Sequence, residues 1–181
     1  MAVDQRAQKS RTKIYQALLQ LCDQGVAFDQ VSVRLLVETA YVSRQTFYRH
    51  YASPQAVITQ LFDAHLADFL SAFHVQQLQG QPLTAESMVA ELLRSWQNRF
   101  DFFRLVEWAN MRQVFIQGVS RFNASIARDN HKALMDEQAI CDIYAASIYM
   151  FLRSYVLQRL WTVPQATALL LHLTNNFDQI F

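Results

Sequence analysis

Apolar residues recur at helical spacing along most of the chain. Ile14, Leu18 and Leu21 stand three or four positions apart, with Ala17 beside them, and this spacing predicts a first helix that ends near Asp23. The same periodicity predicts further helices at about 33–39, 44–50, 54–77, 84–97, 100–110, 112–128, 136–160 and 164–179. Residues 26–33 alternate like a strand, but no nearby segment could pair with them, so we interpret them as a connector.

Glycine and proline are rare, and most of them mark helix ends. The chain has three of each. A residue at positive φ is favoured just after a helix, and proline suits the first helical turn because it lacks an N–H. Five of the six stand at such positions: Gly25, Gly80, Pro54, Pro82 and Pro164. The sequence therefore predicts an all-α fold of about nine helices, of which the first three form a helix-turn-helix domain.

Two short helices with serine caps lie within residues 32–51. Ser32 precedes the first helix, and Ser43 precedes the second, about three residues after the first one ends. This spacing lets the helices brace each other at a steep angle, and it leaves the second one projecting outward. The outward face of the second helix would carry Arg44, Gln45, Thr46, Tyr48, Arg49 and His50. Such hydrogen-bond donors suit the reading of base edges and the binding of phosphates.

Charge is distributed unevenly along the chain. Residues 1–54 contain seven Lys/Arg and four Asp/Glu, a net charge of +3, whereas the rest contains nine and eleven, a net charge of −2. A basic N-terminal third favours a nucleic-acid-binding module joined to a second module. An alternative stays open for the individual side chains, because Tyr48 and His50 could pack at the surface and Arg44 could pair with Glu38.

Residues 13–62 resemble the DNA-binding domain of the TetR/AcrR family of transcriptional regulators. The family pattern is roughly T-V-x-x-I-A-x-x-A-G-V-S-x-x-T-x-Y-x-H-F, and residues 32–51 of this chain read SVRLLVETAYVSRQTFYRHY. The part V-S-x-x-T-x-Y-x-H-[FY] is specific and is matched in full. The resemblance implies a DNA-binding domain over residues 1–53 and a helical effector-binding and dimerisation domain over residues 54–181.

The resemblance also implies roles for individual side chains and for the whole protein. The residues expected to face bases are Arg44, Gln45 and Thr46, with Arg49 on the same helix. The residues expected to hold phosphates are Ser32, Ser43, Tyr48 and His50, helped by Arg11, Lys13 and Arg34. The protein would be a homodimeric repressor that binds a palindromic operator in double-stranded DNA and releases it when a small hydrophobic effector binds.

Three positions depart from the family pattern. Tyr41 replaces the turn glycine, Leu35 replaces a common acidic residue, and Pro54 stands where a lysine usually meets a phosphate. Proline suits the first helical turn but carries neither a charge nor an N–H. These departures favour weaker or redistributed operator contacts. They leave open a second function, a TetR-like coactivator or adaptor that has weakened or lost operator binding and acts through protein partners.

Residues 139–152 are apolar almost all round, with Asp142 as the one charged residue. A helix that is apolar on every side must be buried on every side, and a second copy of the chain would cover the side that faces away from the core. A monomeric core is the alternative. By resemblance to the family's four-helix dimer interface, the interface residues we expect are Ile143, Ser147, Phe151, Tyr155, Leu169, Leu170 and Leu173. A twofold dimer also suits two half-sites one helical turn apart.

Aromatic residues crowd into residues 96–122. The middle helices of the family enclose an effector cavity, and large aromatic side chains suit a hydrophobic ligand. The ligand-binding residues we expect are Phe100, Phe103, Trp108, Met111, Phe115 and Tyr144. Plain core packing is the alternative, because aromatic residues at helical spacing usually belong to the core.

The sequence contains no signature of an enzyme, a metal site or a cofactor. It has no glycine-rich phosphate loop, no nucleophile elbow and no HExxH. Cys22 and Cys141 form no CxxC pair, which favours a reducing compartment. The N-terminal residues are polar rather than signal-like, and the longest apolar run, residues 143–152, is too short to span a bilayer. We therefore expect a cytoplasmic protein without a cofactor or a membrane partner.

Overall fold

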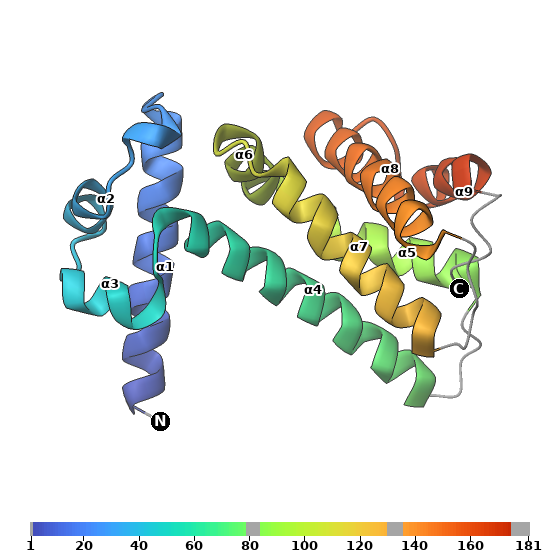
Figure 1. Ribbon diagram of the computed structural model, residues 1–181, viewed down its shortest axis with the longest axis horizontal. Coiled ribbons are helices and arrows are strands. Elements are labelled where there is room, and N and C mark those ends of the chain that lie inside the picture. The colour runs from blue at the N-terminus through green and yellow to red at the C-terminus, as the bar shows by residue number, and fades with distance from the viewer. Residues whose placement is uncertain (1, 79–83, 130–135, 175–181) are drawn as a thin grey trace. The chain divides into compact units, whose positions relative to one another are not determined.

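The computed structural model describes residues 2–78, 84–129 and 136–174 (Figure 1). Within these ranges the chain forms nine α-helices and one short 3-10 helix, so the prediction of an all-α fold with about nine helices is confirmed. The elements are α1 (Ala2–Asp23), η1 (Phe28–Gln30), α2 (Val33–Ala40), α3 (Arg44–His50), α4 (Pro54–Leu78), α5 (Ala85–Trp96), α6 (Phe100–Trp108), α7 (Arg112–Asp129), α8 (Glu137–Gln158) and α9 (Val163–Thr174). Gly80 and Pro82 lie outside the described residues.

Packing divides the chain into two compact units. The first comprises the described residues up to Phe62 together with Arg104–Met111, and the second comprises Asp63–Phe103 and the described residues from Arg112 onward. The first unit is thus larger than residues 1–53, because the opening turns of α4 belong to it and bury Val57 and Ile58 almost completely. Helix α6 contributes residues to both units.

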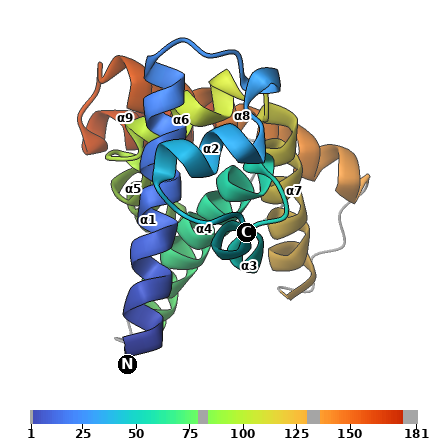
Figure 2. The same ribbon diagram turned by 90° about the vertical axis from the view of Figure 1, so that its left-hand side faces the viewer.

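In the first unit, α2 and α3 pack against α1 and against each other (Figure 2). The core between them contains Ile14 and Leu18 of α1, Leu36 of α2 and Phe47 of α3, all fully buried. The predicted connector at residues 26–33 contains the 3-10 helix η1 and no strand, which confirms its interpretation.

The C-terminal half of α6 is fastened to the connector that follows α1. The indole N–H of Trp108 donates a 2.8 Å hydrogen bond to the carbonyl oxygen of Val26, and the Trp108 ring meets Phe28 edge-on at 4.9 Å. Arg104 forms an ion pair with Asp23 at the end of α1. Residues more than 75 positions apart in the sequence thereby become part of one unit.

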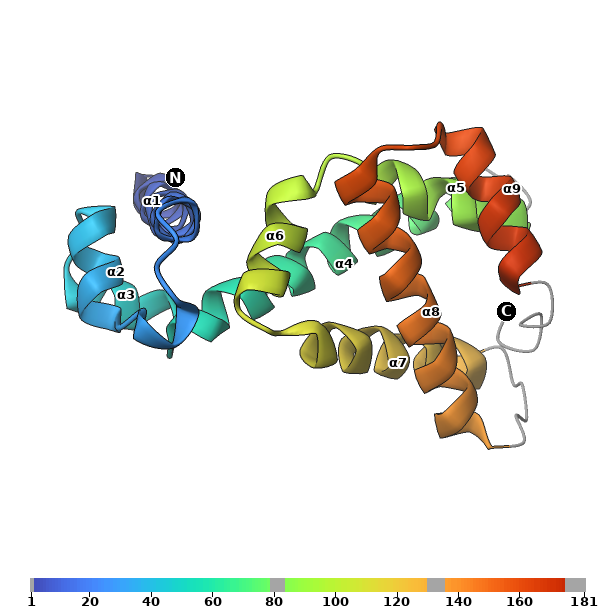
Figure 3. The same cartoon turned by 90° about the horizontal axis from the view of Figure 1, so that it is seen from above.

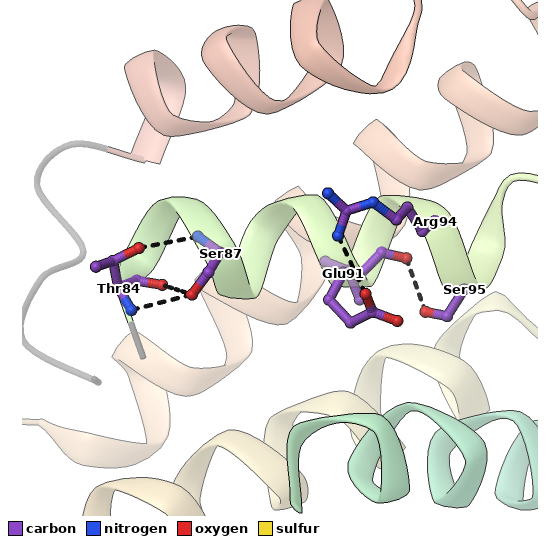
Figure 4. Close-up of polar contacts among 6 residues, drawn as sticks. Thr84, Ser87, Glu91, Arg94 and Ser95 are labelled. Carbon is purple, nitrogen blue, oxygen red and sulfur yellow. Dashed lines mark hydrogen bonds and ion pairs between the residues drawn. The ribbon is translucent and has the colours of Figure 1, made fainter. Parts of the chain in front are cut away.

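In the second unit, α7 packs along α8, and α5 packs along α9 (Figure 3). Helix α5 begins with a capping box, in which the Thr84 side chain accepts from the Ser87 N–H and the Ser87 hydroxyl accepts from the Thr84 N–H (Figure 4). An ion pair between Arg94 and Glu91 lies one turn before the helix ends.

Helix α8 has 22 residues and is therefore longer than the ten-residue apolar run within it. By length and composition alone it is long and apolar enough to cross a membrane, but half of its most apolar window is buried inside the protein. Burial of that kind is typical of a core helix. It agrees with the nearly unbroken apolar character of residues 139–152.

An aromatic cluster forms the core of the second unit. Trp96 of α5 lies 5.5 Å from Phe115 of α7, measured between ring centroids, and Phe115 lies 5.0 Å from Tyr149 of α8. Phe103 of α6 contacts all three of these rings. The imidazole of His65 on α4 meets Trp96 edge-on, so one cluster joins five helices.

His65 carries a polar atom into this cluster. Its Nδ1 is buried and has no hydrogen-bond partner among the described residues. Burial is the largest cause that lowers the pKa of His65, to about 4, and nearby Arg99 lowers it further, while Asp68 acts in the opposite direction. The folded protein therefore holds His65 neutral over a pH range in which the unfolded chain would protonate it.

We expect the stability of the protein to fall as the pH drops from about 6.5 toward 4, because the unfolded state then binds a proton at His65 that the folded state excludes. In His65→Phe this loss should shrink by on the order of 2 kcal/mol. Urea denaturation at pH 7 and pH 5 measures it, with exposed His172→Gln as the control that should keep the wild-type dependence. If the free energy of unfolding falls equally between pH 7 and pH 5 in wild type and in His65→Phe, this role of His65 is contradicted.

Candidate nucleic-acid interface

Helices α2 and α3 begin at serine N-caps, as the sequence predicts. The Ser32 hydroxyl accepts a 3.1 Å hydrogen bond from the Leu35 N–H, and the Ser43 hydroxyl accepts a 3.0 Å bond from the Thr46 N–H. The Ser43 and Thr46 hydroxyls also bond to each other at 2.9 Å. These local bonds determine where both helices start, and they draw the Thr46 side chain toward the cap.

Helix α3 has seven residues and one buried anchor, Phe47. The Phe47 ring contacts Tyr48 and Tyr51 at 5.6 and 5.7 Å between centroids, and Tyr51 is also buried. The rest of the helix surface is largely exposed: Arg44, Gln45 and Arg49 face solvent, and Tyr48 is 60% exposed. The structure therefore brings these predicted DNA-contacting side chains onto the outer surface of α3.

Basic side chains surround His50 at the end of α3. Partial burial lowers the pKa of His50, and the charges of Arg11 on α1 and Arg49 on α3 lower it further. The two guanidinium groups are therefore close enough to His50 to repel its proton. Lys13 is exposed on α1, two residues after Arg11. The result is a region of concentrated positive charge beside a short, exposed helix.

Arg34 forms a 2.8 Å ion pair with Glu38 one turn further along α2, and both side chains are largely exposed. In the alternative interpretation of the sequence Glu38 pairs with Arg44, but the structure gives Glu38 a different partner. An exposed pair of this kind contributes little stability, so Arg34 can exchange Glu38 for another anion at small cost.

The link from α3 to α4 is closed by two further contacts. The Ser53 hydroxyl accepts a 3.2 Å bond from the Ala56 N–H and so caps α4, and Pro54 occupies the first turn of α4. The Gln60 amide donates a 2.9 Å bond to the His50 carbonyl oxygen and holds the end of α3. No sequence pattern indicates this role of Gln60, because the two residues meet through tertiary packing.

The predicted ligand-binding residues fall into two groups. Phe103, Phe115 and Tyr144 are buried in the second unit, and Phe100 lies there beneath the Arg159 guanidinium, 5.5 Å from its ring centroid. Trp108 and Met111 belong to the first unit. Two further buried polar atoms of the second unit, Nδ2 of Asn123 and Oγ1 of Thr167, have no hydrogen-bond partner among the described residues.

The predicted dimer residues divide by exposure. Phe151, Tyr155 and Leu170 are buried within the protomer, and Leu169 is half-buried. Ile143, Ser147 and Leu173 are exposed, as is Met150, which is absent from the predicted set. Ile143, Ser147 and Met150 are spaced by four and three residues, so they form one stripe along α8.

No model of a known protein family matches the chain. The chain is 23% identical over 158 residues to the HTH-type dhaKLM operon transcriptional activator DhaS of Lactococcus lactis subsp. lactis, a match that covers 83% of this chain and 80% of that protein. The crystal structure of Lin0861 from Listeria innocua is similar with a TM-score of 0.78 and 26% identity, covering 96% of this chain and 93% of that one.

A TetR transcriptional regulator from Streptococcus agalactiae 2603V is also similar, with a TM-score of 0.53, 21% identity, and coverage of 96% of this chain and 97% of the regulator. The relatives with functional names regulate transcription, in agreement with the expectation of a protein that is not an enzyme. The chain therefore has the all-helical fold of the TetR transcriptional regulators.

Proposed function

We propose that the protein regulates transcription by binding duplex DNA through α3 and the basic side chains beside it. The single observation that carries this proposal is the surface of α3, where Arg44, Gln45 and Arg49 are exposed on a helix that Phe47 anchors. In a helix-turn-helix the second helix enters the major groove, where arginine and glutamine read base edges. Similarity to a transcriptional activator and to a TetR regulator supports the same function.

Phosphate contacts in this proposal come from the flanking elements. Arg11 and Lys13 are exposed on α1, and Tyr48 presents its hydroxyl from α3. The His50 imidazole, which lies near Arg11 and Arg49, would donate to a phosphate as well. The Ser32 hydroxyl accepts a cap bond, which leaves its hydrogen available as a donor to a phosphate, whereas the Ser43 hydroxyl also bonds to the Thr46 hydroxyl.

We propose that the regulator acts as a repressor when its site overlaps a promoter, because a bound dimer excludes polymerase without any further contact. The similarity to the activator DhaS favours a second candidate, activation or coactivation through a protein partner. Expression of a reporter fused to the regulated promoter distinguishes repression from activation. Deletion of the gene raises expression from a repressed promoter and lowers expression from an activated one.

The functional unit in this proposal is a homodimer joined through α8 and α9. More than half of the surface of Ile143, Met150 and Leu173 is exposed in the protomer. Apolar side chains of this size at the surface are favourable places for a second copy to bind. A twofold axis would place two copies of α3 against the two halves of a palindromic operator.

A small hydrophobic effector would bind within the second unit. The cluster around Phe103, Phe115 and Tyr149 is a buried apolar environment, and the Asn123 amide nitrogen is a buried donor without a partner among the described residues. Buried polar atoms are normally hydrogen-bonded, so an orphaned donor suits a polar group on a ligand. Compounds that raise the melting temperature and release bound DNA would identify this effector.

We expect the purified protein to bind a duplex selected from a random pool in preference to a scrambled duplex. Arg44→Ala should weaken this binding at least about tenfold and relax sequence preference, because one arginine–base pair contributes roughly 1–3 kcal/mol. Tyr48→Ala should weaken binding without altering the salt slope, since it removes no charge. Arg121→Ala, at an exposed site on α7, is the matched control and should bind like wild type.

Fluorescence anisotropy across a series of salt concentrations measures these affinities and slopes. Wild-type protein that binds selected and scrambled duplexes equally at 150 mM salt, on the order of physiological ionic strength, would refute sequence-specific DNA binding. The coactivator candidate would then be favoured.

Ile143→Glu combined with Met150→Glu should convert the dimer to a monomer of 21.0 kDa, because two buried charges would face their own copies across the twofold axis. Sedimentation velocity measures the mass. Leu70→Glu, at an exposed apolar position on α4, is the control that should leave the dimer intact. If the double variant still sediments with twice the mass of one chain, the dimer interface does not lie on this stripe of α8.

A further inference from the structure

Three helices of the first unit end in the same hydrogen-bonded motif. At the end of α2, the Val42 N–H donates to the Val37 carbonyl oxygen at 3.1 Å, and the Tyr41 N–H donates to that of Glu38 at 3.3 Å. This pair of bonds is a Schellman motif, which requires a left-handed residue after the helix. Gly25 stands at the equivalent place after α1, where the Val26 N–H donates to the Leu21 carbonyl oxygen and the Gly25 N–H to that of Cys22. Asn110 stands there after α6, where the Met111 N–H donates to the Val106 carbonyl oxygen and the Asn110 N–H to that of Glu107.

The three motifs use different residues at one conformation. The φ angles are 71° at Gly25, 52° at Tyr41 and 53° at Asn110. Glycine has no Cβ and accepts a positive φ freely, and asparagine is the side chain that tolerates it best. Tyrosine is bulky, and its Cβ crowds the following carbonyl oxygen in this conformation. Tyr41 therefore strains a turn that the same unit builds without strain elsewhere.

The tyrosine side chain gives almost no packing in return, since Tyr41 is 88% exposed. Arg159, another bulky residue at positive φ, differs because its guanidinium lies over the Phe100 ring. The strain at Tyr41 is therefore not offset by burial of its ring. Strain of this kind is found where function needs the side chain.

Tyr41 lies in the turn between α2 and α3, three residues before Arg44. Its Cα is thus within roughly 11 Å of the Arg44 Cα, so the exposed Tyr41 lies beside the start of α3. Arg44, Arg49 and the exposed Tyr48 make this region basic and aromatic, which complements a polyanion. A phenol hydroxyl donates to phosphate oxygens, as tyrosine does at many protein–DNA interfaces.

We propose that Tyr41 is an additional DNA-contacting residue, which places its hydroxyl on a backbone phosphate next to the groove that α3 enters. This inference rests on the proposed function of α3. The tyrosine lowers the stability of the free protein and raises its affinity for the duplex. Stability and DNA affinity therefore respond in opposite directions when the side chain is removed.

The test compares Tyr41→Gly and Tyr41→Phe with wild type, using a fluorescein-labelled duplex that the wild-type protein has selected from a random pool. Tyr41→Gly should melt about 2–4 °C higher, because glycine relieves the strained φ. The same variant should bind the duplex about tenfold more weakly, with an unchanged salt slope because no charge is lost. Tyr41→Phe keeps the ring and the strain, so it should melt like wild type and bind like Tyr41→Gly.

Asn110→Gly is the matched control, since it places glycine in the same motif at the end of α6. It should bind the duplex like wild type. Wild-type affinity in Tyr41→Gly, while Arg44→Ala loses binding, overturns the contact of Tyr41 and leaves the proposed function standing. A lower melting temperature in Tyr41→Gly also overturns it, because the ring would then stabilise the fold. A wild-type protein that selects no duplex overturns both proposals.

Discussion

The burial of Phe47 determines which side chains of α3 reach the surface. Seven residues are too few for a stable isolated helix, so α3 depends on tertiary contacts for its existence. Phe47 supplies them by filling the core between α1 and α2, and removing it from water stabilises the unit by roughly 2–3 kcal/mol. With that side fixed inward, Arg44, Gln45 and Arg49 are directed outward.

Helix α6 belongs to both compact units through different contacts. Phe103 is buried in the aromatic cluster of the second unit, and five residues later Trp108 donates to the Val26 carbonyl in the first. A single nine-residue helix therefore carries a buried anchor at one end and a directional hydrogen bond at the other.

The turn at Tyr41 and the start of α4 show how this chain departs from the TetR/AcrR sequence pattern while it keeps the fold of those regulators. Backbone bonds at Val42 close the turn, so the geometry persists although a tyrosine stands where a glycine would be free of strain. Pro54 occupies the first turn of α4, where its missing N–H leaves no hydrogen bond unmade, and Ser53 supplies the cap. The backbone arrangement is thus retained, while the chemical groups presented beside α3 are changed.

Local chemistry in the sequence was sufficient to predict the helices and several of their ends, whereas the ends predicted at 110 and 160 lie two residues beyond those observed. Caps at Ser32, Ser43 and Ser53 act on N–H groups three residues away, and Gly25 acts within its own turn, so these contacts are visible as short spacings. The exposed face of α3 followed from the same spacing.

The tertiary structure decided the contacts between distant residues, because they depend on how whole helices pack: Trp108 with Val26, and Gln60 with His50. It also decided which sides of the apolar α8 are covered. Phe151 and Tyr155 are inside and Met150 is outside, and no polar stripe in the sequence marks that division.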